Sequence, residues 1–475
     1  MERKPMRLGE NREEVLDFAT SITKAAWKSF DQARLIEPVI DSQNEALLSQ
    51  TAPELGIDPL IALNEASSLL NQSLAHARPR FLAYVGSSGL EIGAIADLLA
   101  GSYDINMALV AGAATRVENQ TVQWVSEFLG YECAGGWFTS GGTISNINAL
   151  VAARENALPG SRIHGLSKTK SAMYCSQEVH YSIVRAAELM GLGSASVRKV
   201  AIVSEGRGLN PVVLEELICA DIDAGVVPIC VVATAGTTLT GAIDPINDIA
   251  DICEKYGIWL HVDGAYGLPA ASTSRAPLFA GLNRADSVSV DAHKWMYVPK
   301  ACSILMIKKQ APFARAFGHD EAYIPHDEEI LNPVDMTLEY SRPFRALKLW
   351  LAMRVHGMSE FRAALEGNLA QANYCYEKAR DCGEFEVLPF HPVLSTVPIR
   401  HIVKGCPDVD VHNRELAQAI MNDGSSYVSP AIIDGQQWLR PCFTNIRTTL
   451  TDVDVFLESA IELGIGLCPT HGTAN

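Results

Sequence analysis

Short apolar segments alternate with helix-like segments in the middle of the chain, and this alternation constrains the fold more than any other feature. Runs of this length and composition are typical of strands buried on both faces of a parallel sheet. Because helix-like stretches separate the runs, the sequence predicts an α/β fold with a mostly parallel sheet covered by helices on both faces. The four runs are SAMYCS (171–176), KVAIVS (199–204), VPICVVAT (227–234) and IWLHVDG (258–264).

The stretch DPINDIADICEKYG (244–257), which precedes the fourth run, shows the helical pattern in most detail. Its apolar residues recur at the spacing i, i+3, i+4, i+7, which gives a helix one apolar face. Asp244 is predicted to cap this helix, Pro245 to lie in its first turn and Gly257 to end it.

The regions on either side of this α/β segment have different patterns. Residues 12–76 read as amphipathic helices with few strand signals, and residues 358–381 read as one long helix. We therefore expect an N-terminal helical segment over 1–85, a large domain over 86–360 and a small C-terminal α+β domain over 361–475.

Charge and composition exclude several classes of function. The chain of 475 residues has 55 acidic and 38 basic side chains and a formal net charge of −17, which argues against nucleic-acid or anionic-membrane partners. No apolar run reaches the roughly 18 residues of a membrane span, and the first residues, MERKPMRLGENREE, have no apolar signal core. Eleven cysteines form no C-x-x-C pair, so we expect reduced thiols, a cytoplasmic protein and no metal site.

A glycine-rich loop stands before the helix-like part of WFTSGGTISNINAL (137–150). Gly141 and Gly142 would let the backbone approach an anion, and the Thr143 hydroxyl could add a hydrogen bond. Free N–H groups and the dipole of the following helix would then hold a phosphate. A tight turn before a helix gives the same pattern, so the loop alone leaves both interpretations open.

Ionisable residues follow the predicted strands. Asp263 ends IWLHVDG, and the carboxyl ends of parallel strands face the ligand crevice, although an acid there can also act as a cap. Lys294 follows the strand-like DSVSV (286–290); among apolar neighbours its pKa could fall and it could form a Schiff base, or it could be a surface lysine. His180 shares a helical face with apolar residues, which by itself favours a buried core histidine.

These features together satisfy the needs of pyridoxal 5′-phosphate (PLP), which are a phosphate site, a ring partner, an acid for the pyridine nitrogen and a lysine. At this point the chain resembles the group II PLP-dependent amino-acid decarboxylases of fold type I, such as aromatic-L-amino-acid decarboxylase and glutamate decarboxylase. The similarity extends from RPRFLAY (78–84) to LRPCFTNIRTT (439–449). Its most specific motifs are SGGTISN, EVHYSIVRA, VATAGTTLTGAIDPI, IWLHVDGAYG and DAHKW.

The resemblance implies a role for each matching position. Lys294 would carry PLP as a Schiff base, Asp263 would pair with the pyridinium nitrogen, and His180 would stack on one ring face instead of filling a core. Ala265 would lie against the other face. The resemblance further implies a homodimer, with the site at the subunit boundary and the N-terminal helical segment wrapped around the partner. The other implied cofactor-binding positions are Gly142, Thr143, Thr238, Asp291 and His293.

The implied reaction is α-decarboxylation of an L-amino acid to the amine and CO₂. Two alternatives remain: a decarboxylating aldehyde synthase that releases peroxide and ammonia, and a non-decarboxylating carbon–carbon lyase. Tyr84 matches the aromatic-type enzymes, whereas Val85 and Ala108 replace aromatic residues that are usual in them. A neutral substrate, aromatic or large aliphatic, is therefore favoured over an acidic one or a diamine.

The stretch YIPHDEEILNPVDMTLEYSRPFR (323–345) matches a loop that closes over substrate in the family. It is a few residues shorter than in the aromatic enzymes, and no tyrosine falls clearly on the position that protonates Cα. Tyr323 is the predicted catalytic proton donor, with His326 as the other candidate. Few apolar anchors and several charges predict that the loop moves.

Overall fold

The centre of the computed structural model, which describes residues 7–32, 39–166, 169–319 and 332–467, is a seven-stranded sheet in the order β1-β7-β6-β5-β4-β2-β3. β7 pairs antiparallel with β1 and β6, and the other neighbours are parallel. All strands except β7 therefore run in one direction, and their carboxyl ends meet at one edge. The strands are β1 (Gly135–Thr139), β2 (Ser171–Ser176), β3 (Val197–Val200), β4 (Val227–Thr234), β5 (Trp259–Asp263), β6 (Ser287–Asp291) and β7 (Ser303–Ile307).

The sequence placed β2 and β4 correctly and β5 to within a residue at each end. The prediction for 199–204 was wrong in extent, because β3 starts at Val197 and leaves the sheet after Val200. Ile202 then forms only an isolated bridge with Leu209.

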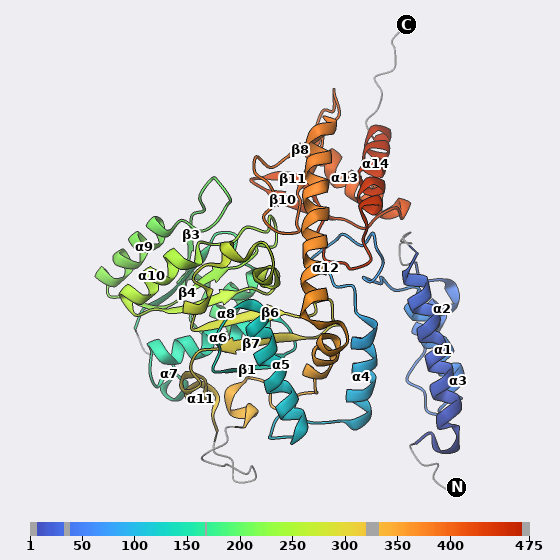
Figure 1. Cartoon of the computed structure of the whole chain (residues 1–475), viewed down its shortest axis with the longest axis horizontal. Helices are drawn as coiled ribbons and strands as arrows, with labels where there is room; N and C mark the ends of the chain where they lie inside the picture. The colour runs from blue at the N-terminus through green and yellow to red at the C-terminus, as the bar shows by residue number, and fades with distance from the viewer. Residues whose placement is uncertain (1–6, 33–38, 167–168, 320–331, 468–475) are drawn as a thin grey trace.

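Helices cover both faces of this sheet, as the alternation of segments predicted (Figure 1). Within the described residues, no helix is both long and apolar enough to cross a membrane. The helices of this region are α5 (Ala113–Leu129), α6 (Gly142–Ala157), α7 (Ser161–His164), α8 (Tyr181–Leu189), α9 (Pro211–Asp223), α10 (Ile246–Tyr256) and α11 (Ala311–Phe317).

The helix predicted before β5 is α10, and it ends at Gly257 as expected, in a left-handed conformation with φ 66°. The predicted cap was wrong. The carboxylate of Asp244 instead accepts hydrogen bonds from the backbone N–H groups of Leu209 and Thr234, and Pro245 stands at the cap position. Asp244 therefore ties the end of β4 to the segment before α9 instead of capping a helix.

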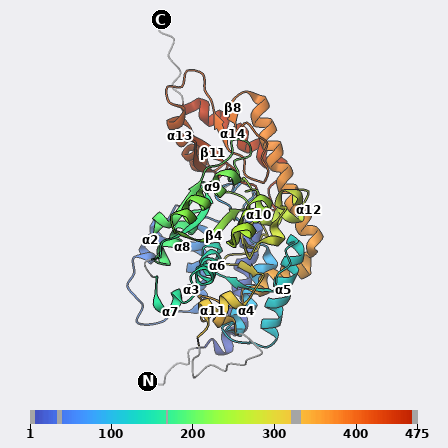
Figure 2. The same ribbon diagram turned by 90° about the vertical axis from the view of Figure 1, so that its left-hand side faces the viewer.

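A second, smaller sheet stands at one end of the large one in both views (Figures 1 and 2). The chain reaches it through α12 (Ala346–Cys382), which is interrupted by non-helical backbone at Gly357. The small sheet is antiparallel, in the order β10-β11-β9-β8. Its elements are β8 (Phe385–Val387), β9 (Ile399–His401), α13 (Val409–Asp423), β10 (Ser429–Ile433), β11 (Gln436–Arg440) and α14 (Leu450–Leu467).

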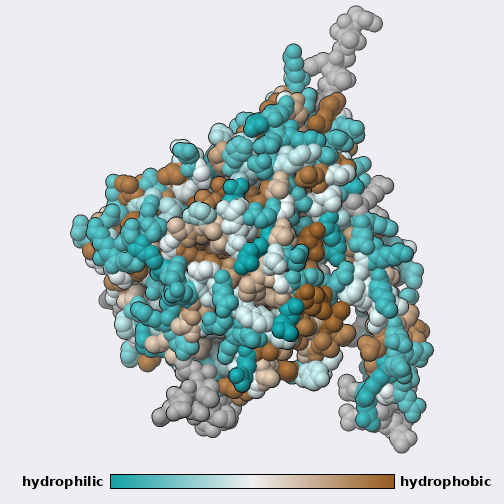
Figure 3. Space-filling view, viewed as in Figure 1, coloured by the Kyte–Doolittle hydropathy of each residue, from teal (hydrophilic) through white to brown (hydrophobic). Residues whose placement is uncertain are grey.

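The first helices form an arm beside the rest of the molecule (Figure 1). Of the residues in α1 (Arg12–Phe30), α2 (Ser42–Leu48) and α3 (Pro59–Asn71), only Asn44 is buried. The next helix, α4 (Glu91–Tyr103), packs on α12 but leaves apolar side chains exposed, and an apolar group shows on the surface in that region (Figure 3). The exposed apolar residues of α4 are Ile95, Leu98, Leu99 and Tyr103.

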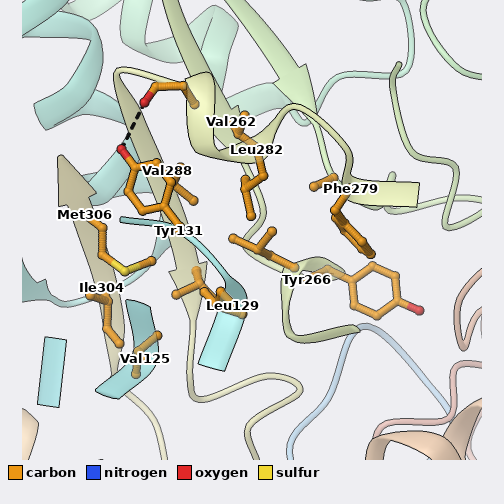
Figure 4. Packing of buried hydrophobic residues seen from close by; sticks show 14 of the residues in the cluster. Val125, Leu129, Tyr131, Val262, Tyr266, Phe279, Leu282, Val288, Ile304 and Met306 are labelled. Atoms are coloured by element: carbon orange, nitrogen blue, oxygen red, sulfur yellow. Dashed lines mark hydrogen bonds between the residues drawn. The ribbon is translucent and has the colours of Figure 1, made fainter. Parts of the chain in front are cut away.

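Side chains of the large sheet alternate between two apolar cores, because successive residues of a strand point to opposite faces. In β4, Val231 belongs to the core formed with α5, α9, α10 and α12, and Val232 to the core formed with α6, α8 and α11. Figure 4 shows the first core, where Val125 of α5 lies near the strand residue Ile304. Two packed faces hold the strand ends, and hence the residues after them, in fixed positions.

Candidate active site

The carboxyl ends of the parallel strands open into a cavity of about 250 Å³. Thr234 and Asp263 are the last residues of β4 and β5, and Lys294 lies three residues beyond the end of β6. Every cofactor-binding position expected from the sequence lines this cavity, in agreement with the rule that ligands bind where parallel strands end. These positions are Gly142, Thr143, His180, Thr238, Asp263, Ala265, Asp291, His293 and Lys294.

Lys294 forms an ion pair with Asp291, whose carboxylate is almost entirely buried. The distance from Nζ to Oδ2 is 3.0 Å. Burial by itself would lower the pKa of Lys294, but the Asp291 carboxylate, together with Asp263, raises that pKa above its usual value. Burial likewise opposes ionisation of Asp291, yet Lys294 and His293 lower its pKa overall. The expectation of a lysine pKa lowered by apolar neighbours was therefore wrong for the cofactor-free chain.

Two donors hold the carboxylate of Asp263. Its Oδ2 accepts a hydrogen bond from the side-chain amide of Asn146 at 2.8 Å, and its Oδ1 accepts from the backbone N–H of Ala265 at 3.1 Å. The hydroxyl of Ser289 lies 3.4 Å from Oδ1. These bonds fix the carboxylate at the base of the cavity.

His180 precedes α8 as its cap instead of lying on a helical face. Its backbone is extended (φ −64°, ψ 141°), and its Nδ1 accepts from the backbone N–H of Ser182 at 3.3 Å. The prediction of a core histidine was wrong, because the ring lines the cavity. Partial burial lowers the pKa of His180, so the imidazole is neutral at physiological pH.

The cavity fits an anionic pyridine aldehyde such as PLP. A Cβ added to Gly142 would lie 3.0 Å from Oδ2 of Asp291 and 3.1 Å from Cβ of Ala265, so a side chain would crowd this point. Gly142 also begins α6, whose first N–H groups have no intrahelical partners and suit a phosphate. Among the described residues, the buried Oγ1 of Thr234 has no hydrogen-bond partner, which leaves it for a ligand.

Gly141 of the predicted phosphate loop also lines the cavity, and so do five residues that sequence reasoning did not assign: Asn146, Ser182, Thr234, Gly236 and Tyr266. Asn146 could have been found, because it lies one helical turn after Gly142 and so shares its face of α6. Thr234 could also have been found, since it ends a predicted strand beside the strand that carries Asp263. The others follow from packing that no local pattern indicates.

The residues expected to contact substrate are not in this cavity. Tyr84 is 52% exposed and packs against Phe81, Val85 lies at the edge of the large core, and Ala108 is buried away from the cavity. The expected proton donor Tyr323 and the alternative His326 lie outside the described residues.

A larger hollow of about 640 Å³ lies between α5 and the start of β1. Glu118 contributes to its wall, but none of the described residues that line it is a lysine or histidine. The smaller cavity is therefore the one that can bind an aldehyde covalently and hold a ring nitrogen.

Comparison with known proteins agrees with this assignment. The family model described as "Pyridoxal-dependent decarboxylase conserved domain" matches residues 42–401. An aromatic-L-amino-acid decarboxylase from Bacillus atrophaeus is 30% identical over 418 residues, which are 86% of this chain and 85% of the relative. A 4-hydroxyphenylacetaldehyde synthase from Rhodiola rosea is 27% identical over 446 residues, which are 90% of this chain and 89% of the relative. The crystal structure of Oryza sativa TDC with PLP and tryptamine superposes with a TM-score of 0.91 at 25% identity, covering 98% of this chain and all of that one.

Proposed function

Because this chain belongs to the pyridoxal-dependent decarboxylase family and is a PLP-dependent amino-acid decarboxylase, we propose that its substrate is a neutral L-amino acid, aromatic or large aliphatic. The observation that carries the site assignment is the single cavity that brings Lys294, Asp263 and His180 together. The similarity to an aromatic-L-amino-acid decarboxylase supports the neutral substrate. Val85 and Ala108 stand where the aromatic enzymes usually have aromatic residues, and in a dimer whose sites lie at the subunit boundary they would leave room for an aliphatic side chain.

Each cavity residue expected from the sequence has a proposed task in holding the cofactor. Lys294 would bond the aldehyde carbon through Nζ, and Asp263 would keep the pyridine nitrogen protonated. His180 and Ala265 would flank the two faces of the ring. The start of α6 at Gly142, with the hydroxyl of Thr143, binds the phosphate. Thr238, Asp291 and His293 complete the set of cofactor-binding residues.

The ion pair at the base of the cavity positions Lys294 but, because it raises the lysine pKa, it also holds the proton that must leave before a bond can form. Nζ can attack a carbonyl only after it loses a proton, and Oδ2 of Asp291 at 3.0 Å is placed to accept it. Bound PLP supplies an electron sink for the pair left on Cα when CO₂ departs. Because hydrogen bonds already fix the Asp263 carboxylate, it would need no reorganisation to stabilise the pyridine nitrogen in this step, which would favour the transition state.

The last step requires a proton at Cα, and Tyr323 is our proposed donor, with His326 as the alternative. A positioned donor typically contributes about 10²–10⁴-fold. Tyr323→Phe should slow amine formation within that range while CO₂ release suffers less. Equal amine yields from Tyr323→Phe, His326→Ala and the unaltered enzyme would assign the donor elsewhere.

A panel of L-amino acids tests the substrate class directly. CO₂ and amine should form from aromatic and large aliphatic members at higher kcat/KM than from glutamate, aspartate or the diamino acids. A preference for an acidic member would overturn the neutral assignment, whereas no CO₂ from any member would overturn the activity itself.

A decarboxylating aldehyde synthase is the second candidate, supported by the similarity to 4-hydroxyphenylacetaldehyde synthase and by the missing tyrosine position in the loop. In that reaction O₂ and water convert the amino acid to CO₂, aldehyde, ammonia and hydrogen peroxide. Peroxide and ammonia in amounts equal to CO₂ would favour it. Amine equal to CO₂, without peroxide, would favour the simple decarboxylase.

We infer a homodimer as the working form. The apolar side chains of α4 are exposed in one chain, and the arm of α1–α3 buries almost nothing within it. A second copy would cover both surfaces. Tyr84, Val85 and Ala108, which do not line the cavity of their own chain, would then lie near the cavity of the partner.

We also propose that the protein acts in the cytoplasm. The described cysteines, ten in number, are all free thiols, and six of them are buried. Reduced cysteines are typical of this compartment.

A further inference from the structure

Asn146 is a buried asparagine that no role proposed above uses, yet all of its hydrogen-bonding capacity is satisfied inside the molecule. Its side chain is 1% exposed. Nδ2 donates to Oδ2 of Asp263 at 2.8 Å and to Oγ of Ser182 at 3.2 Å. Oδ1 accepts from Nε2 of His261 at 3.0 Å and from Oγ of Ser289 at 2.8 Å. Complete satisfaction fixes the amide in one orientation, because every alternative would leave a buried polar atom without a partner.

The buried wall behind Asn146 keeps that orientation. His261 is fully buried, and burial lowers its pKa to about 4, so it is neutral. Because its Nε2 faces the carbonyl oxygen of Asn146, the single ring proton lies on Nε2. Its Nδ1 then accepts from the hydroxyl of Ser287, which itself accepts from the indole N–H of Trp259 at 2.9 Å. The amide of Asn146 cannot flip without losing its hydrogen bond from His261, which this series of hydrogen bonds holds in one tautomer.

The other side of Asn146 acts on His180 through Ser182. Oγ of Ser182 receives a hydrogen from Asn146, so its own hydrogen is free to point at Nδ1 of His180, 2.9 Å away. The backbone N–H of Ser182 also donates to that nitrogen. A nitrogen that accepts two hydrogens cannot carry one, so the proton of the neutral ring must lie on Nε2.

We propose that Asn146 is a positioning residue that serves two cavity residues at once, orienting the carboxylate of Asp263 and, through Ser182, fixing the proton of His180 on Nε2. The proposal rests on the roles given to Asp263 and His180 under the proposed function. Asp263 and His180 would both depend on the Asn146 amide. The orientation of the carboxylate and the position of the imidazole proton would therefore change together.

Asn146→Asp tests this with almost no change of size. The new carboxylate cannot donate to Asp263, and it would draw the Ser182 hydroxyl hydrogen away from His180. Asn148→Asp is the matched control, because Asn148 lies on the same helix, is equally buried and contacts the backbone of Leu338 instead of the cavity. Ser182→Ala, which removes only the hydroxyl link, serves as a second variant if Asn146→Asp does not fold.

The first readout is the ring ¹⁵N spectrum of His180 in cofactor-free protein with labelled histidine, assigned with His180→Gln. The unaltered protein and Asn148→Asp should show a neutral ring protonated on Nε2. In Asn146→Asp and Ser182→Ala the His180 ring should no longer be only the Nε2-protonated tautomer. The spectrum should show a mixture of the two neutral tautomers or a cationic ring. A proton on Nδ1 in the unaltered protein, or an unchanged spectrum in both Asn146→Asp and Ser182→Ala, would overturn the proposal.

The second readout is the affinity of cofactor-free protein for PLP, measured by fluorescence titration. Loss of a hydrogen bond to a charged group should weaken binding at least about tenfold in Asn146→Asp, and Asn148→Asp should stay within about threefold of the unaltered protein. Failure of the unaltered protein to bind PLP would refute the proposed function. Normal binding by the unaltered protein and by Asn146→Asp alike would refute only the role of Asn146.

Discussion

At the scale of single residues, the site depends on opposite charges held close together at the base of one cavity. The Nζ of Lys294 lies 3.0 Å from Asp291, and Asp263 accepts the amide of Asn146. Burying such groups is stabilising only when each keeps its partners. Replacing Lys294 would leave the buried Asp291 carboxylate without its cation, so this change should lower stability as well as cofactor binding.

Lys294→Ala should abolish covalent attachment of PLP, because no other cavity residue offers a primary amine. After treatment with borohydride, the unaltered protein should carry one PLP label on the peptide that contains Lys294. Lys255→Ala, which removes an exposed lysine far from the cavity, should label normally. A PLP-labelled lysine in Lys294→Ala at the level of the unaltered protein would be incompatible with the assignment.

Asp263→Ala should lower kcat by about 10²–10³-fold, the range for loss of one preorganised electrostatic contact. Its PLP affinity should fall as well, because the pyridine nitrogen loses its partner. Asp263→Glu keeps the charge but moves it, so it should recover part of the lost rate. Steady-state kinetics at saturating PLP measures this, and wild-type kcat in Asp263→Ala would exclude the role.

At the scale of elements, the sequence was most informative where a pattern is local. Apolar runs located β2, β4 and β5, and Gly257 marked the end of α10. The contacts that complete the site join residues far apart in the chain, as with Asn146 and Asp263, and no spacing reveals such pairs. Asp244 was misassigned for the same reason, since its partners lie on other segments.

The resemblance to a family supplied what the local patterns could not. Spacing alone favoured a core role for His180, and only the family motif placed this residue at the cofactor. The motifs could not place Tyr84, Val85 and Ala108 relative to the cavity, which these residues do not line in their own chain.

Two buried histidines join β9 to α13, and they make the stability of the small sheet depend on pH. Nδ1 of His401 lies 2.9 Å from Nε2 of His412. Burial, with His412 next to it, lowers the pKa of His401 to about 4. Because the unfolded chain binds this proton near pH 6.5 and the folded chain does not, the stabilisation is present above pH 6.5 and is lost as pH falls towards 4.

The expected loss is about 1.4 kcal/mol for each pH unit in that window. Urea denaturation followed between pH 7 and pH 5 should show a falling free energy of unfolding. His401→Gln should flatten the profile, whereas His356→Gln, an exposed change on α12, should leave it unaltered. An equally steep profile in His401→Gln would assign the pH dependence to other groups.

At the scale of the whole molecule, the arm and α4 present apolar surface that the chain itself does not cover (Figure 3). Light scattering should therefore give twice the 51.4 kDa of one chain. Leu98→Glu on α4 should weaken the dimer and lower activity together. Leu278→Glu is the control, because Leu278 is exposed but belongs to neither α4 nor the arm, and this change should do neither. A fully active monomer would refute both the dimer and the shared cavity.

The most direct test of the central claim uses amino acids labelled with ¹⁴C in the carboxyl group. Purified protein with PLP should release labelled CO₂ from at least one neutral L-amino acid. Release should stop in Lys294→Ala and after removal of PLP, and readdition of PLP should restore it only in the unaltered protein. No labelled CO₂ from any amino acid, or equal release from Lys294→Ala, would contradict a decarboxylase that works through this cavity.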